Sequence, residues 1–223
     1  MGRRFFFASE RLGDAFLRAK ALPYVVPAWM TTMHESGRES NGAEVVMSAE
    51  AIGAAVARMA VEIVSAHTHR EAALLGILRR GRPLADRLAQ EIEALTGEGP
   101  KVGSLATTLY RDDLRTGKSA VGTGRGETHF DFDVDGAWVV LVDDVLNSGR
   151  TVRAALDEVM DYGRPARIQL ACLIDRGLRE LPIRADYLGK SIETQPDDHV
   201  AVHLAEVDGE DVVLLHRTQR IEE

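Results

Sequence analysis

The sequence has little of several features that would each point to a particular class of protein. Its one cysteine, Cys172, has no partner for a disulfide and lies in the apolar run IQLACLI, so we expect a buried thiol and a reducing, cytoplasmic setting. No apolar run approaches the roughly 18 residues of a spanning helix, which predicts that the chain does not cross a membrane. Lys and Arg number 27 against 35 Asp and Glu, so non-specific coating of nucleic acid is not expected.

The remaining composition is that of an ordinary globular domain. Hydrophobic residues make up 45% and charged residues 28% of the 223 positions, which is typical of soluble proteins. This length suits one well-buried α/β domain with an attached extension. The stretch HESGRESNGAE at 34–44 is polar and contains glycine, as linkers do. We therefore expect residues 1–45 to be a disordered N-terminal extension and residues 46–223 to form the domain.

Hydrophobic periodicity predicts alternating helices and strands. Ser48 is a plausible N-cap for a helix whose apolar stripe begins at Ile52. Continuous apolar runs predict strands that are buried on both faces, with helical patterns between them. The strands are expected at 72–78, 102–110, 138–144 and 167–175, and the further helices at 83–95 and 151–160. Because 138–175 has the order strand, helix, strand, the sheet should be parallel, and alternation across 200–216 predicts a hairpin.

In the stretch VVLVDDVLNSGRT at 139–151, an apolar run is followed by two adjacent carboxylates and then by the small polar residues of a turn. In an open parallel sheet, the ligand crevice lies beyond the carboxyl ends of the strands. Gly149 allows main-chain amides to approach a ligand closely, and the hydroxyls of Ser148 and Thr151 lie beside the positive end of the next helix. This combination predicts a site for a phosphate monoester.

The carboxylate pair, Asp143 and Asp144, needs a different ligand group, because carboxylates repel phosphate. The vicinal hydroxyls of a ribose, one short sugar away from the phosphate, are fitting partners. The alternative is that Asp143 caps the strand and Asp144 the turn, as acidic residues often do. The sequence alone favours the functional interpretation without excluding the structural one.

The segment 111–130 carries four glycines, four Lys or Arg residues and no core pattern. Long loops in compact domains are usually functional or mobile, so we expect this segment to be one or the other. GKS at 117–119 ends like a Walker A phosphate loop, but that motif requires Gly at position 112, where Asp112 stands. We regard this match as accidental.

Four stretches together resemble a known family. VLVDDVLNSGRT resembles the phosphoribosyl pyrophosphate (PRPP) signature of type I phosphoribosyltransferases. More narrowly, the PyrR family of pyrimidine operon regulators has segments similar to YRDDL at 110–114, GRPARIQLACLIDRG at 163–177 and RELPIRADYLGK at 179–190. The similarity extends from about Ser48 to Leu215. It implies an α/β fold of the type I phosphoribosyltransferase class, with a parallel sheet flanked by helices and a small hood.

The resemblance also implies an activity and its partners. Members of the PyrR family transfer the phosphoribosyl group of PRPP to uracil, giving UMP and pyrophosphate, with Mg²⁺ held by PRPP and not directly by the protein. They also respond to UMP as regulators that bind a pyr-type mRNA leader, and self-association into a homo-oligomer is expected. An alternative is an RNA-binding attenuator that uses the fold mainly as a nucleotide sensor.

The family's functional residues can be assigned to matching positions. The catalytic pair would be Asp143 and Asp144. The 5′-phosphate and PRPP site would comprise Val145, Leu146, Asn147, Ser148, Gly149, Arg150 and Thr151. Pyrophosphate would contact Arg79, Arg80, Gly81 and Arg111. Without the resemblance, a solvated helix start would be the favoured interpretation of the two adjacent arginines. The base would lie beside Asp175, Arg176 and Gly177.

One departure from the family concerns the base. Purine-salvage relatives carry an acidic residue at the position of Asn147, and PyrR proteins usually have Tyr there. Asn147 cannot act as a general base at neutral pH, which disfavours a purine enzyme. Uracil has a comparatively acidic ring proton and needs no strong base.

Other departures concern RNA. The basic residues that could form an RNA-binding patch are Arg58, Arg179, Arg184 and Lys190, although they could equally be solvated charges or substrate ligands. The family's usual polar residues are replaced at Ala57, Val61 and Leu178, and Glu193 adds a carboxylate that RNA phosphates would disfavour. The sequence therefore supports the enzymatic role more strongly than RNA binding.

Overall fold

The computed structural model describes residues 39–40, 43–67, 72–107 and 127–218. Its main sheet has five strands in the order β4-β3-β5-β6-β7, and every neighbouring pair is parallel. The strands are β3 (Ala72–Ile77), β4 (Val102–Leu105), β5 (Trp138–Leu146), β6 (Arg167–Asp175) and β7 (Tyr187–Ser191). The predicted parallel sheet is confirmed. The predicted strand 102–110 is shorter than expected, since β4 ends at Leu105.

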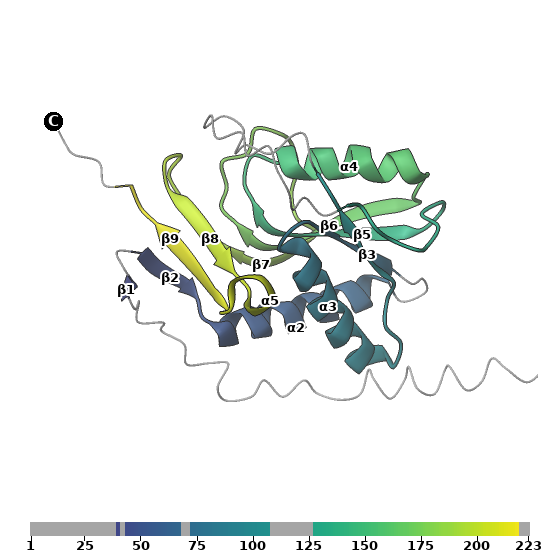
Figure 1. The fold of residues 1–223 in the computed structure, drawn as a ribbon, viewed down its shortest axis with the longest axis horizontal. Coiled ribbons are helices and arrows are strands. Elements are labelled where there is room, and N and C mark those ends of the chain that lie inside the picture. The colour runs from purple at the N-terminus through teal and green to yellow at the C-terminus, as the bar shows by residue number, and fades with distance from the viewer. Residues whose placement is uncertain (1–38, 41–42, 68–71, 108–126, 219–223) are drawn as a thin grey trace, which may run out of the picture. The chain divides into compact units, whose positions relative to one another are not determined.

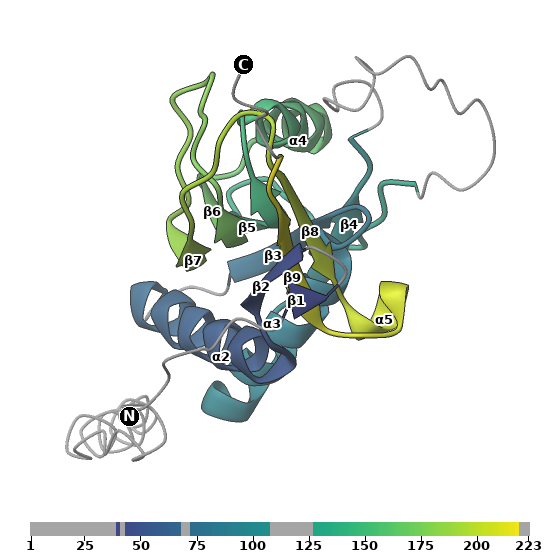
Figure 2. The same ribbon diagram turned by 90° about the vertical axis from the view of Figure 1, so that its left-hand side faces the viewer.

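Helices cover both faces of this sheet (Figure 1). One face packs against α2 (Ala49–Ala66) and α3 (Gly81–Thr96), and the other against α4 (Arg150–Tyr162). Successive residues of β5 point to opposite faces, so Val140 and Val142 belong to the first core and Val139 and Leu141 to the second. Figure 2 shows the same two layers of helices from the side. No helix among the described residues is long and apolar enough to cross a membrane.

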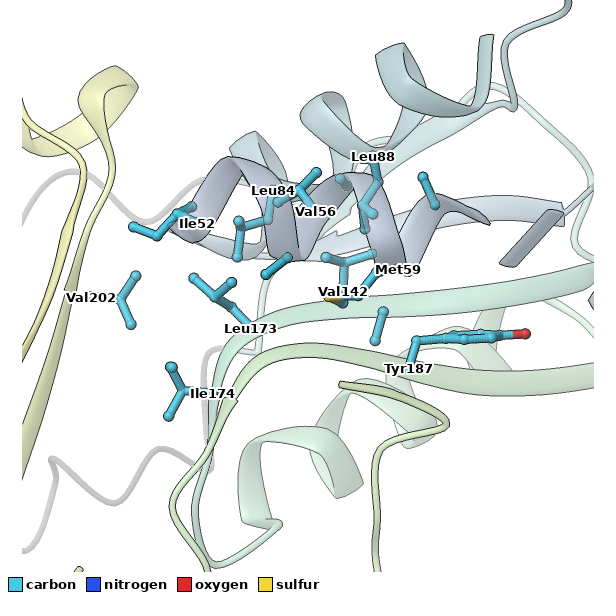
Figure 3. Close-up of a cluster of buried hydrophobic side chains, with 14 of the residues drawn as sticks. Ile52, Val56, Met59, Leu84, Leu88, Val142, Leu173, Ile174, Tyr187 and Val202 are labelled. Carbon is cyan, nitrogen blue, oxygen red and sulfur yellow. The ribbon is translucent and has the colours of Figure 1, made fainter. Parts of the chain in front are cut away.

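The predicted helix after Ser48 forms for the expected reasons. The Ser48 hydroxyl accepts a hydrogen bond from the Ala51 amide at 3.3 Å, which satisfies a free donor of the first turn. Ile52, Val56 and Met59 form the buried stripe of α2 (Figure 3). They pack with side chains of α3 and with the strand residues Val142 and Leu173. A buried apolar cluster therefore supports the face of the sheet beneath the carboxyl end of β5.

A second, smaller sheet forms the hood. Its strand order is β1-β2-β9-β8, and all of its pairs are antiparallel. The strands are β1 (Glu39–Ser40), β2 (Ala43–Met47), β8 (His199–His203) and β9 (Val212–His216). β8 and β9 confirm the predicted hairpin, but their connection contains a helical turn, α5 (Ala205–Asp208), which the alternation did not indicate.

The hood also corrects the boundary at residue 45. Ala43 and Glu44 lie in β2, and Glu44 pairs with Leu215 of β9, so the folded domain begins before residue 46. These two residues look like linker in the sequence because the strand is short and its apolar partners are more than 160 positions away. Glu39 and Ser40, also within the predicted extension, form β1 of this sheet, whereas residues 1–38 and 41–42 lie outside the described residues.

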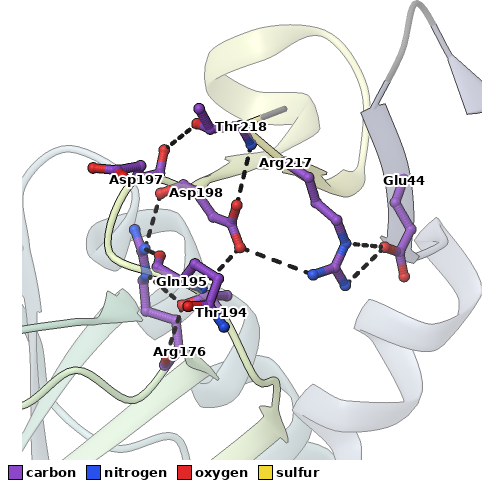
Figure 4. A network of polar contacts seen from close by, with 8 residues as sticks. All are labelled: Glu44, Arg176, Thr194, Gln195, Asp197, Asp198, Arg217 and Thr218. Carbon is purple, nitrogen blue, oxygen red and sulfur yellow. Dashed lines mark hydrogen bonds and ion pairs between the residues drawn. The ribbon is translucent and has the colours of Figure 1, made fainter. Parts of the chain in front are cut away.

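Arg176, which follows β6 of the main sheet, is hydrogen-bonded to the segment 194–198 that leads into β8 of the hood (Figure 4). Its guanidinium donates to the hydroxyl of Thr194 at 3.2 Å and to the main-chain carbonyls of Gln195 and Asp198 at 3.1 and 2.9 Å. Asp198 in turn accepts from the amides of Gln195 and Thr218. Burial lowers the pKa of Arg176, and the carboxylate of Asp198 opposes that shift. Because Nε and Nη2 are both engaged in these contacts, the side chain of Arg176 serves as an anchor of the fold.

Candidate functional site

The acidic pair lies where the sequence places it, near the carboxyl end of β5. Asp143 is 5% exposed, and its Oδ1 accepts a hydrogen bond from the Asp144 amide at 3.0 Å, whereas Asp144 is half-buried. In register, Asp143 lies beside Cys172 on β6. Burial raises the pKa of the Cys172 thiol well above its usual range, and the neighbouring carboxylates raise it further. The thiol is therefore protonated and structural, as predicted.

The polar turn after β5 runs directly into α4. Gly149 has φ of 92°, a left-handed conformation that favours glycine, and it is the residue immediately before Arg150 at the start of the helix. A Cβ at position 149 would also lie 3.3 to 3.4 Å from Ile183 and Leu181. Ser148 is buried, and its hydroxyl accepts from the Arg150 amide at 3.4 Å. The turn thus brings main-chain amides and the positive end of α4 to the edge of the sheet.

Residues 179–181, which follow β6, are hydrogen-bonded to the polar turn between β5 and α4. The amides of Glu180 and Leu181 both donate to the Ser148 carbonyl at 3.1 Å. The guanidinium of Arg179 donates to the carbonyls of Leu146 and Asn147 at 3.1 and 2.7 Å. These bonds occupy the carbonyls of residues 146–148, so the backbone of the turn is fixed before any ligand arrives. A preformed turn of this kind costs little ordering entropy when an anion binds.

The loop after β3 packs against β5 close to the acidic pair. A Cβ at Gly81 would lie 2.2 Å from the Val142 carbonyl oxygen, which shows how closely the two backbones approach. Arg79 is exposed, and its peptide bond to Leu78 is cis. The pKa of Arg80 is raised, chiefly by its hydrogen bonds to Asp208 and to a smaller extent by the charge of Asp144. The structure therefore brings Arg80 and Gly81 to the acidic pair, while Arg111 lies outside the described residues.

The end of β6 supplies the third edge of the site. Asp175 pairs in register with Leu146, so the proposed base loop begins beside the polar turn. Its carboxylate accepts from the Gly177 amide at 2.8 Å and from the Arg179 guanidinium. Gly177 has φ of 73°, which turns the chain sharply. Of the three residues predicted to lie beside the base, Asp175 and Gly177 shape this turn, whereas the side chain of Arg176 is used by the hood.

Comparison with known proteins decides the family. The phosphoribosyl transferase domain model matches residues 43–208. The chain is 51% identical over 169 residues to the Bifunctional protein PyrR of Roseiflexus sp. (strain RS-1), with 75% of this chain and 91% of that protein covered. It is 47% identical over 171 residues to the Bifunctional protein PyrR of Clostridioides difficile (strain 630), covering 76% and 96%. The chain belongs to the PyrR family.

Solved structures agree with the fold of this PyrR-family chain. A hypoxanthine-guanine phosphoribosyltransferase from Bacillus anthracis is 19% identical, with a TM-score of 0.55 over 77% of this chain and 95% of that one. A hypoxanthine phosphoribosyl transferase from Trypanosoma cruzi is 18% identical, with a TM-score of 0.58 over 80% and 94%. At these identities the likeness concerns the fold alone, and it confirms the predicted phosphoribosyltransferase fold.

The basic residues proposed for RNA have very different surroundings in this PyrR-family chain. Arg58 on α2 donates to Glu62 and to the carbonyls of Leu188 and Gly189 on the edge strand β7. The Lys190 ammonium donates to the Val46 carbonyl at 2.8 Å. Arg179 is bound to carbonyls of the polar turn. Arg184 is exposed. Three of the four proposed residues therefore have a structural role within the fold, whatever else they do.

Leu178 is strained, and we expect Leu178→Asn to stabilise this PyrR-family chain. Its φ of 58° is unfavourable for a side chain that contains Cβ, and Asn tolerates this conformation better. Since Leu178 is 38% exposed, the substitution loses little apolar burial. We predict that the free energy of unfolding in urea rises by about 1 kcal/mol. Leu95→Asn, at an exposed leucine of α3, should give no such gain, and a destabilised Leu178→Asn variant would contradict the prediction.

Proposed function

We propose that the chain is a uracil phosphoribosyltransferase, which converts uracil and PRPP into UMP and pyrophosphate. One observation carries the proposal: the acidic pair, the polar turn before α4 and the Arg79–Gly81 loop meet at one edge of the sheet. A phosphate monoester, a ribose and a pyrophosphate are the three parts of PRPP, and each has a chemically matching region there. The relatives are named Bifunctional protein PyrR, and the resemblance to the PyrR family makes uracil the favoured base.

Catalysis in this proposal is mainly electrostatic placement. Breaking the bond between ribose C1′ and pyrophosphate leaves positive charge on the ribose ring and negative charge on the leaving group. Asp143 and Asp144 would hold the ribose hydroxyls and stabilise the positive ring. The amides of residues 147–151 would hold the 5′-phosphate, and Arg79 and Arg80 would bind the departing pyrophosphate. Holding the reacting groups in line converts a bimolecular encounter into an oriented one, which lowers the barrier.

Magnesium fits this arrangement as a companion of the substrate. Mg²⁺ in proteins is commonly held by one or two carboxylates together with substrate phosphates and water. Here the phosphates of PRPP would hold the ion, and Asp143 and Asp144 would lie near it at the same edge of the sheet without binding it directly. Within the described residues, no group of three or more His, Cys, Asp or Glu side chains is arranged to hold a metal ion. When bound, the ion would neutralise charge on the pyrophosphate leaving group.

The base preference depends on Asn147, which is half-buried in the polar turn. An amide cannot accept the proton of a purine ring nitrogen as a carboxylate would. Uracil loses its ring proton more easily, so an amide is compatible with turnover. The side chain would serve to position the base or the ribose.

The test is nucleotide formation by the purified full chain with PRPP and Mg²⁺, with uracil, hypoxanthine and adenine offered separately. We expect UMP from uracil and no product from either purine. IMP or AMP formation would contradict the assignment of the base. If the protein binds UMP but forms no product from any base, the result would favour the regulatory function over the enzymatic one.

A second function, UMP-responsive binding of a pyr-type mRNA leader, is supported by the word bifunctional in the relatives' names and by the exposed Arg184. We expect Arg184→Gln to weaken leader binding and to reduce its salt dependence by about one unit of slope. Arg153→Gln removes the same charge from the exposed side of α4 and is the matched control. An unchanged salt slope in Arg184→Gln would count against this surface. A cytoplasmic location and self-association belong to the same proposal.

A further inference from the structure

Asp208 forms a two-point ion pair with Arg80, although the two residues lie 128 positions apart. Nε of Arg80 donates to Oδ2 of Asp208 at 2.9 Å, and Nη2 donates to Oδ1 at 2.8 Å. The side chains are 32% and 19% exposed. Oδ2 also accepts from the Leu204 amide at 3.0 Å, so the carboxylate is held by its own helical turn, α5. A carboxylate of the hood is thus paired with an arginine of the proposed pyrophosphate loop.

The pair remains ionised at neutral pH. Hydrogen bonding to Arg80 lowers the pKa of Asp208 to about 2, and the same contact raises the pKa of Arg80. A guanidinium has five N–H donors, of which this contact uses two. Arg80 can therefore still donate to an anion while Asp208 is bound. What Asp208 removes is net positive charge, at the place where a leaving group with several negative charges would gather.

The turn that carries Asp208 is held in place by a second arginine. Arg87 of α3 donates to Glu206 at 2.8 Å through Nε and to Asp211 at 2.7 Å through Nη2. These contacts flank Asp208 and do not involve Arg80. The loop backbone is also fixed, because Gly81 packs against the Val142 carbonyl. Neutralising Asp208 should therefore change the charge at Arg80 while the turn and the loop stay where they are.

We propose that Asp208 is the counter-ion of Arg80 and limits how tightly the site holds pyrophosphate. The inference rests on the proposed function, since it takes the Arg79–Gly81 loop as the pyrophosphate site. A carboxylate repels the polyanion and offsets one of the two adjacent arginine charges, which weakens binding of both PRPP and the product. A site that released pyrophosphate too slowly would be inhibited by its own product, and Asp208 counteracts that.

The experiment compares Asp208→Asn with Asp211→Asn in the full chain. Asn keeps the shape and can still accept from the Leu204 amide, but it removes the charge. By calorimetry with magnesium pyrophosphate, we expect Asp208→Asn to bind roughly tenfold more tightly than wild type. The KM for PRPP should fall as well, whereas the KM for uracil should not change. Asp211→Asn loosens the contact with Arg87 and should leave the affinity for pyrophosphate within about twofold, because it leaves Arg80 paired.

Salt supplies a readout that a merely structural change would not give. The difference between wild type and Asp208→Asn should shrink as ionic strength rises, because it arises from charge. Asp208→Ser, which also lacks the charge, is the second variant if Asp208→Asn does not fold.

Each other result has a definite meaning. Equal or weaker pyrophosphate binding by the folded Asp208 variants would overturn the counter-ion role, and weaker binding would mean that Asp208 orients Arg80. Wild-type protein that binds neither pyrophosphate nor PRPP would overturn the proposed function together with this inference. Wild-type protein that makes UMP and binds pyrophosphate, with no change in Asp208→Asn, would overturn this inference alone.

Discussion

Replacing Asp143 and Asp144 together by Asn is expected to reduce UMP formation by at least about 10³-fold, while the protein stays folded. The two carboxylates are the only part of the proposed mechanism that faces the positive charge developing on the ribose. Their loss removes hydrogen-bond acceptors for the ribose hydroxyls and the electrostatic stabilisation of the ring. Asn has nearly the same shape as Asp, so the packing around the buried position 143 is kept. The measurement is the initial rate of UMP formation, with thermal unfolding followed in parallel.

A matched control is available for this double variant. Asp131 and Asp161 are exposed, so replacing both by Asn changes the net charge equally without touching the edge of the sheet. That control should keep its activity. Full activity in the Asp143, Asp144 variant would overturn the ribose assignment and leave the two residues as structural caps of the strand and the turn.

Gly81→Ala is expected to lower kcat/KM for PRPP by about 100-fold, because it moves the pyrophosphate loop. A Cβ at this position would lie 2.2 Å from the Val142 carbonyl oxygen and 3.1 Å from its carbon, and neither backbone atom can move independently of β5. The loop must therefore shift away from the strand that carries the acidic pair. A displacement of about 1 Å between groups that act on one substrate is enough for an effect of this size. The measurement is steady-state kinetics with PRPP varied.

Gly53→Ala is the matched control for that substitution. Gly53 lies in α2 with no atom within 4 Å of an added Cβ, so Ala should raise helix stability by about 1 kcal/mol and leave kinetics unchanged. If Gly81→Ala kept normal kinetics for PRPP, the loop after β3 could not be the pyrophosphate site. Arg80 would then not be a ligand of pyrophosphate.

The main sheet could be predicted from the sequence because its signal is local. Strands buried on both faces appear as unbroken apolar runs, and the run 167–175 became β6 without change. The hood could be predicted only in part. β2 is five residues long, and it is recognisable as a strand only through its pairing with β9. Short edge strands that depend on distant partners leave no periodic pattern of their own.

Within the site, the acidic pair and the polar turn were predictable because one strand, one turn and one helix position them. The role of Arg179 was not predictable in the same way. A sequence cannot distinguish an arginine that faces solvent from one whose guanidinium binds main-chain carbonyls, as Arg179 does at Leu146 and Asn147. Asp208 was missed for a related reason, since its partner Arg80 is far away in the chain and only the fold brings them together.

The central claim is that residues 143–151 hold the ribose and 5′-phosphate of a pyrimidine nucleotide, and a crystal structure of the protein with UMP tests it most directly. The account predicts the phosphate on the amides of the turn before α4, the ribose hydroxyls within hydrogen-bond distance of Asp143 or Asp144, and the uracil ring beside Asp175 and Gly177. A nucleotide bound elsewhere, or a phosphate seated away from Ser148 and Gly149, would contradict it.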